Sequence, residues 1–300
     1  MGLTRLHATR RRLLAAGLAL GGLGLSAARP NGSAAARGTT LPVGPALRWG
    51  VDYGPAPDPA IAADLDLLVL EPDHGYPLGP LSGPGRSLLA YLSLGEVADQ
   101  RPYAATLRAQ GLLGVRNAHW PDATYIDLRD PRWTALVVDR LIPPLLARGY
   151  DGLFFDTLDN AEAMETADPV GAAGMVAAAV RLVRAIRARY PGILLMMNRG
   201  YALLPAAAPA IDLLLGEAMA SRWNFQRKRY DLLSASDWTW QATRLRAAQA
   251  ANPALALLTL DYWDMADPAS VRALYDRERA AGFAPYVSML ALDRLYREPA

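Results

Sequence analysis

From about residue 46 onward, short runs of apolar residues alternate along the chain with longer amphipathic stretches. The runs are almost continuously hydrophobic, which is typical of parallel strands that are buried on both faces of a sheet. Eight of these runs predict strands: Leu47–Tyr53, Leu65–Leu70, Leu88–Leu94, Gly152–Phe155, Ile193–Met197, Asp212–Leu215, Leu255–Leu260 and Pro285–Met289.

The stretches between the runs show helical periodicity, most clearly in Gly171–Tyr190 and Pro268–Ala281. Repeated strand–helix units over about 250 residues predict an α/β fold, a (β/α)₈ TIM barrel that occupies residues 46–300 as a single domain. An open, doubly wound sheet is the alternative that this pattern leaves. One strand-like segment, Thr124–Leu128, lies in the long connection after the third strand. We interpret it as an insertion over the barrel mouth.

Residues 1–28 have the organisation of an export signal, in which Arg10–Arg12 precede an apolar run and small residues follow at Ser26–Ala28. The paired arginines resemble a twin-arginine signal. An uncleaved membrane anchor is the alternative, but the run is shorter than the about 18 residues of a membrane span and is interrupted by glycines. We therefore expect a periplasmic or secreted protein without stable membrane insertion, and residues 29–45 read as a flexible leader.

The composition narrows the chemistry. The chain has no cysteine, only three histidines and a single lysine, Lys228, so thiol catalysis, cysteine-ligated metals and Schiff-base chemistry lack their side chains. The net charge of +2 gives no sign of a nucleic-acid-binding surface. Acid–base chemistry is left to carboxylates.

Acids follow six of the eight predicted strands, at the end of the barrel where active sites of this fold lie. Aspartates at such positions are as often helix caps as functional groups. Glutamate caps helices poorly, so function is the better interpretation for Glu96 and Glu217. The acids are Asp52, Glu71, Glu96, Asp156, Glu217 and Asp261, with Asp73 and Asp159 close behind.

Uncharged and aromatic residues share this end of the barrel, among them Tyr53, Tyr103, Asn198, Arg199 and Tyr262. Aromatic rings beside convergent carboxylates suit sugars, whose C–H faces stack on rings and whose hydroxyls take hydrogen bonds. Packing between barrel and helices is the alternative for each ring taken alone.

Several motifs in chain order resemble glycoside hydrolase family 114, which comprises endo-α-1,4-polygalactosaminidases and related exopolysaccharide hydrolases. The resemblance implies a (β/α)₈ fold and two catalytic acids, Asp156 after the fourth strand and Glu217 after the sixth. The motifs are Gly50–Gly54, Ala90–Val97 with Arg101 and Tyr103, Asp127–Trp133, Gly149–Asp159, Asn198–Gly200 and Gly216–Glu217.

By similarity to α-glycosidase barrels, Asp156 is expected to act as nucleophile and Glu217 as acid/base in a retaining, endo-acting enzyme that needs no metal or organic cofactor. A ring of acids would focus negative potential and favour a cationic polymer of galactosamine and N-acetylgalactosamine over a uronate. We expect a monomer. The predicted substrate-binding residues are Asp52, Tyr53, Glu71, Glu96, Arg101, Tyr103, Asp159, Asn198, Arg199, Asp261 and Tyr262.

Two other functions stay open from the sequence. Clustered carboxylates could hold Mg²⁺ in a metal-dependent barrel enzyme, although the missing base lysine weakens this alternative. The chain could also be a barrel that binds polysaccharide without cleaving it.

Overall fold

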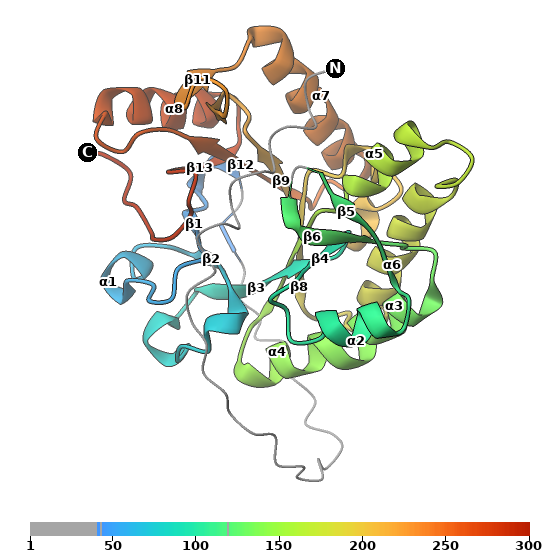
Figure 1. Cartoon of the computed structure of the whole chain (residues 1–300). Coiled ribbons are helices and arrows are strands. Elements are labelled where there is room, and N and C mark those ends of the chain that lie inside the picture. The colour runs from blue at the N-terminus through green and yellow to red at the C-terminus, as the bar shows by residue number, and fades with distance from the viewer. Residues whose placement is uncertain (1–40, 43, 119) are drawn as a thin grey trace.

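The structure is a computed structural model that describes residues 41–42, 44–118 and 120–300 (Figure 1). The predicted export signal, residues 1–28, and most of the predicted leader lie outside the described residues. In the described part of the chain, no helix combines the length and apolarity needed to cross a membrane.

Eight parallel strands form one sheet in which each strand pairs with the next along the chain. All eight predicted strands are confirmed, with ends that move by a few residues. The strands are β1 (Trp49–Asp52), β2 (Leu67–Leu70), β3 (Ser87–Ser93), β7 (Gly152–Asp156), β8 (Leu194–Asn198), β9 (Leu213–Glu217), β12 (Ala256–Tyr262) and β13 (Ala284–Ser288).

The first and last strands meet, so the sheet curls into a nearly closed barrel. The indole Nε1 of Trp49 on β1 donates to the carbonyl oxygen of Ala284 on β13 at 2.9 Å. The rings of Trp49 and Tyr286 lie 5.5 Å apart. The (β/α)₈ prediction is therefore confirmed, and the doubly wound sheet is excluded because its edge strands would lie far apart.

Helices cover the outside of the barrel (Figure 1). Within the described residues they are α1 (Pro59–Ala62), α2 (Ala104–Ala109), α3 (Pro131–Leu136), α4 (Ile142–Arg148), α5 (Asn160–Ala167), α6 (Met175–Arg189), α7 (Ala235–Ala251) and α8 (Pro268–Ala280). Both predicted helices are present. The earlier one starts at Met175 rather than Gly171, because Gly174 before it has a φ of 85°, which is incompatible with a helix.

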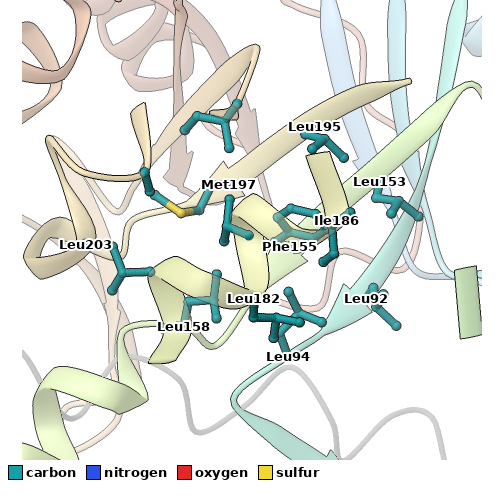
Figure 2. Packing of buried hydrophobic residues seen from close by; sticks show 14 of the residues in the cluster. Leu92, Leu94, Leu153, Phe155, Leu158, Leu182, Ile186, Leu195, Met197 and Leu203 are labelled. Carbon is teal, nitrogen blue, oxygen red and sulfur yellow. The ribbon is translucent and has the colours of Figure 1, made fainter. Parts of the chain in front are cut away.

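Alternate residues of the strands face opposite sides of the barrel wall. Val51, Phe154 and Met196 belong to the cluster inside the barrel. Their neighbours Phe155 and Met197 belong to the cluster between barrel and helices. Figure 2 shows this outer layer, in which Leu182 and Ile186 of α6 pack over strand residues such as Phe155 and Leu195. The alternation decides which strand-end side chains reach the barrel mouth.

Two small antiparallel sheets interrupt the barrel pattern. The connection between β3 and β7 carries β4 (Glu96–Ala98), β5 (Leu113–Asn117) and β6 (Trp120–Ile126), and the strand-like segment predicted there falls partly in β6. A hairpin of β10 (Ser221–Asn224) and β11 (Arg229–Leu232) follows β9. The sequence analysis did not predict the hairpin, because its strands carry charged and amide residues instead of an apolar run.

Candidate active site

Three neighbouring strands end in polar side chains that meet at the barrel mouth. Asp156, Asn198 and Glu217 are the last residues of β7, β8 and β9. The Asn198 side-chain amide donates to Oδ1 of Asp156 at 2.9 Å and to Oε2 of Glu217 at 2.6 Å. One amide group thus joins the two predicted catalytic carboxylates.

A tyrosine hydroxyl holds each carboxylate from the other side. Tyr91 of β3 donates to Oδ2 of Asp156 at 3.0 Å, and Tyr262, the last residue of β12, donates to Oε1 of Glu217 at 2.8 Å. Both acids are buried, so these charge-assisted hydrogen bonds fix their orientation in a low-dielectric setting. The sequence analysis included Tyr262 but missed Tyr91, which it treated only as part of a strand.

The residue after each of the three central side chains adopts a left-handed backbone. The φ angles are 67° at Thr157, 49° at Arg199 and 53° at Ala218. Such angles are unusual for residues other than glycine, and most unusual for a β-branched threonine. Strain of this kind gathers at functional sites, where surrounding contacts maintain it.

Thr157 shows what maintains that strain. Its Oγ1 donates to the carbonyl oxygen of Asp156 at 2.6 Å and accepts from the Gly95 amide at 2.8 Å. A Cβ added to Gly95 would lie 2.1 Å from the carbonyl oxygen of Thr157. Only glycine permits this approach, which explains the glycine that precedes Glu96.

Glu96 is held by two amides. Asn117 of β5 and Asn160 of α5 donate to its Oε2 at 2.7 and 3.2 Å. Nearby, Tyr125 has its phenol pKa raised to about 12 by burial and by the charges of Glu96 and Asp159. Glu96, the first residue of β4 in the inserted sheet, is therefore buried among polar groups, and its role in substrate binding stays a prediction.

Glu71 forms an ion pair with Arg101. The guanidinium contacts both carboxylate oxygens, at 2.8 and 2.9 Å, and also reaches Asp73 at 2.6 Å. Burial disfavours the charge of Arg101, but the charges of Glu71 and Asp73 and the hydrogen bonds to Glu71 together outweigh this effect and raise the pKa of Arg101. The guanidinium also lies 5.6 Å from the centre of the Tyr91 ring. Arg101 therefore supports the tyrosine that holds Asp156.

Arg199 is a buried cation among acids. Its side chain is 5% exposed, and Nε and Nη1 have no hydrogen-bond partner in the structure. Burial works against its charge, yet the carboxylates of Asp159, Glu217 and Asp156 raise its pKa above the ordinary value. It thus offsets part of the negative charge around the central pair.

The two other tyrosines that were predicted to bind substrate differ in how deeply they are buried. Tyr53 is buried, with its ring 4.9 Å from that of Tyr91, the tyrosine that donates to Asp156, in an edge-to-face contact. Tyr103 is half-buried, precedes α2 and packs against the outer core cluster.

Asp52 and Asp261 belong to the outward-facing positions of their strands. The Gly54 amide donates to Asp52 at 2.6 Å, and burial raises the pKa of Asp52 to about 6. The amides of Ala220 and Ser221 each donate to Asp261 Oδ1 at 2.7 Å. The structure therefore does not bring these two carboxylates to the central cluster, and their contacts are with the loops behind it.

The predicted ring of acids is accordingly less negative than its count suggests. Glu71 is neutralised by Arg101, Arg199 counters the central acids, and Asp261 is engaged by backbone amides. The structure describes no group of three or more histidine, cysteine, aspartate or glutamate residues arranged to hold a metal ion within residues 41–42, 44–118 and 120–300.

Behind Asp261 lies Glu278 of α8, which is fully buried. Its Oε1 accepts from the indole of Trp238 at 2.6 Å, and Oε2 has no partner in the structure. Burial, together with the charge of Asp261, raises the pKa of Glu278 from 4.5 to about 8. Between pH 4.5 and about 8, Glu278 is therefore protonated in the folded protein and ionised in the unfolded chain.

We expect this proton to make stability fall as pH rises. The free energy of unfolding contributed by Glu278 is fully present below pH 4.5 and declines up to about pH 8. Glu278→Gln keeps the shape of the side chain but cannot titrate. Over this pH range the Tm of the variant should therefore change by several degrees less than the Tm of wild type. Thermal denaturation from pH 5 to 8 measures it. Glu298→Gln, which removes a partly exposed carboxylate paired with Arg279, is the control. If Tm changes equally with pH in wild type and Glu278→Gln, the expectation is wrong.

Residues 30–299 match the model of glycoside-hydrolase family GH114. The chain belongs to this family. The resemblance inferred from the motifs is thereby confirmed, and the matched region contains every residue of the cluster built on Asp156, Asn198 and Glu217.

Solved structures agree with this assignment. The glycoside hydrolase domain of PelA from Pseudomonas aeruginosa is 30% identical, with a TM-score of 0.73 over 85% of this chain and 99% of that domain. Ega3 from Aspergillus fumigatus, solved in complex with galactosamine, is 14% identical, with a TM-score of 0.59 over 85% of this chain and 95% of its own. At that identity the similarity to Ega3 shows the fold alone.

A relative is also found among curated sequences. An uncharacterised protein from Deinococcus radiodurans is 28% identical over 265 residues, which cover 82% of each chain.

Proposed function

We propose that this family GH114 protein hydrolyses α-1,4 bonds in a polymer of galactosamine and N-acetylgalactosamine, with Asp156 and Glu217 as the catalytic acids. The observation that carries the proposal is the Asn198 amide, which holds one oxygen of each carboxylate. Glycoside hydrolysis needs two carboxyl groups on either side of the scissile bond, and this arrangement supplies them.

The geometry favours a retaining mechanism. Because both oxygens contact the same nitrogen, at 2.9 and 2.6 Å, they lie at most about 5.5 Å apart. Retaining enzymes separate their carboxyl groups by about 5 to 5.5 Å, whereas inverting enzymes leave about 6.5 to 9.5 Å for a water molecule. There is thus little room for a water between these two oxygens.

In this mechanism the Asp156 carboxylate attacks the anomeric carbon while the Glu217 carboxylic acid gives its proton to the leaving oxygen. Glu217, now a carboxylate, then takes a proton from water, and the hydroxide formed releases the sugar from Asp156. Hydrogen bonds from Tyr91 and Asn198 stabilise the charge of Asp156 before it attacks the sugar and again when it is released as a carboxylate.

The choice of substrate rests on the relatives. Ega3, which shares the fold, was solved with galactosamine. The glycoside hydrolase domain of PelA is 30% identical to this chain. The carboxylates and aromatic rings at the mouth suit an amino sugar polymer, and we expect endo action.

The test is hydrolysis of purified α-1,4-galactosaminoglycan, fully acetylated and partly deacetylated. We expect released oligosaccharides of mixed length, since an endo-acting enzyme cuts within the chain. NMR of the first product should show the α-anomer, because retention preserves the configuration. Release of single sugars from one end, or an initial β-anomer, would contradict endo or retaining action. No release from any of these polymers would refute the proposed substrate.

We also propose that the protein is exported, as residues 1–28 suggest. Expression of the full chain should give material that begins between about residues 28 and 37 in the periplasm or medium. N-terminal sequencing of that material measures the cleavage point. An intact Met1 on protein confined to the cytoplasm would refute the proposal.

A further inference from the structure

The hairpin of β10 and β11 carries a row of aromatic rings that the proposed mechanism does not use. Trp223 and Tyr230 face each other across the two strands, with ring centres 4.9 Å apart. Tyr230 lies 6.2 Å from Trp263, the residue that follows β12. The three side chains are half-buried, so part of each ring reaches solvent.

This row lies beside the end of β12, where the Ser221 hydroxyl at the start of the hairpin donates to the carbonyl oxygen of Tyr262 at 3.0 Å. Trp263 is adjacent in sequence to Tyr262, whose hydroxyl donates to Glu217. Trp223 and Tyr230 pack against the cluster that fills the barrel, and the Leu290 amide donates to the Tyr230 hydroxyl at 3.2 Å. The hairpin, β11 of which is orange in Figure 1, therefore extends the barrel mouth outward from Glu217.

The polar side chains of the hairpin follow a different register from its rings. Asn224 donates to Asp231 at 2.7 Å, and Arg229 contacts the same carboxylate at 2.7 Å. These pairs occupy the positions that alternate with Trp223 and Tyr230, so the ring-bearing face is not covered by them. A sheet face with partly exposed rings is a suitable surface for the C–H face of a sugar.

The charge of the hairpin limits which sugars it accepts. Between Ser221 and Leu232 there are four basic residues and one acid, Asp231. A segment of polymer with free amino groups would be repelled by this surface, whereas N-acetylated units carry no charge.

We propose that Trp223, Tyr230 and Trp263 bind uncharged, N-acetylated sugar units of the polymer, next to the bond that Asp156 and Glu217 cleave. The inference rests on the proposed function for its substrate. It adds a second binding segment, with a preference for acetylated units that the catalytic acids do not provide.

The experiment compares Trp223→Ala with wild type on long N-acetylated chains. We expect KM to rise by roughly tenfold with kcat within about twofold, because the row binds the chain away from the reacting atoms. Trp223→Leu fills the same space with an apolar side chain and should show the same rise, which separates loss of stacking from loss of packing. Trp240→Ala is the matched control, since that exposed ring lies on α7 under Arg244 and outside the row.

Binding to the inactive Asp156→Asn protein gives a second measurement, by isothermal titration with N-acetylated and fully deacetylated oligosaccharides. Adding Trp223→Leu should weaken binding of the acetylated chains and leave that of the deacetylated chains unchanged. If wild type cleaves the polymer but both Trp223 variants keep its KM, the row is not a binding segment and the proposed function stands. If wild type cleaves nothing, the titration still decides the inference: unchanged affinity after Trp223→Leu overturns it. Equal weakening for both kinds of chain overturns the preference for acetylated units.

Discussion

Asp156→Asn and Glu217→Gln should each lower kcat by at least about 10³-fold while leaving the fold intact. Both changes keep the shape of the side chain but remove the group that attacks or transfers a proton. The new amide oxygens can still accept from Asn198, and the new NH2 groups can donate to the hydroxyl oxygens of Tyr91 and Tyr262, so the thermal stability should change little. Steady-state kinetics on the polymer, with circular dichroism and Tm measured alongside, tests this.

The two variants should differ in one respect that identifies their roles. A sugar with an acidic phenol as leaving group needs no proton in the first step, so Glu217→Gln should recover much of its kcat/KM on that substrate, although kcat stays low because the second step still lacks its base. Asp156→Asn should not recover, because the attacking group itself is missing. Glu162→Gln and Asp139→Asn, which change exposed carboxyl groups, are the controls. If Asp156→Asn recovers its rate on this substrate and Glu217→Gln does not, the roles of nucleophile and acid/base are reversed. High activity of either variant on the polymer would refute the catalytic pair.

The barrel was predictable because its strands are apolar on both faces and therefore visible as continuous runs. The same runs located the catalytic candidates, since parallel strands bring their carboxyl ends to one edge. Asp156, Asn198 and Glu217 lie far apart in sequence but end three neighbouring strands. The strand pattern therefore places these three residues at one end of the barrel, whereas the choice of Asp156 and Glu217 as the catalytic pair came from the family resemblance.

To predict which way a strand-end side chain faces, one needs both the position at which the strand ends and the alternation of its residues between the two faces of the barrel wall. Tyr91 lies two residues after the inward-facing Leu89 and therefore points into the barrel. Asp261 lies between the inward-facing Leu260 and Tyr262 and points outward. The sequence analysis ended this strand at Leu260, whereas β12 continues to Tyr262 through its pairing with β13. With the longer strand, the outward position of Asp261 could have been derived.

Other features depend on contacts between distant segments and leave no local pattern. Arg101 reaches Glu71 across two strand connections, and Asn117 reaches Glu96 from the inserted sheet. The hairpin that carries Trp223 and Tyr230 has charged residues within its strands, so no apolar run marks it. Such pairs are set by tertiary packing and appear only once the fold is known.

Asn198→Asp tests the link between the two acids most directly. The wild-type amide has two N–H groups and gives one to each carboxylate, at 2.9 and 2.6 Å. An aspartate here has none when ionised and at most one when protonated, so at least one contact becomes an oxygen–oxygen repulsion. We expect kcat to fall by about 10²- to 10³-fold, the usual cost of one lost catalytic hydrogen bond.

The pH profile separates the lost hydrogen bonds from the added charge. A third carboxylate disfavours ionisation of Asp156, so in Asn198→Asp the acidic side of the kcat profile should move to higher pH. Asn198→Ala loses both donors without adding a charge, and its profile should move less for a similar loss of rate. Asn117→Asp makes the same chemical change beside Glu96 and should keep most of the activity. If Asn198→Asp keeps wild-type kcat, or if Asn117→Asp is equally impaired, the amide that joins Asp156 and Glu217 is not central to the reaction. The two acids would then have to be held for catalysis by Tyr91 and Tyr262 alone.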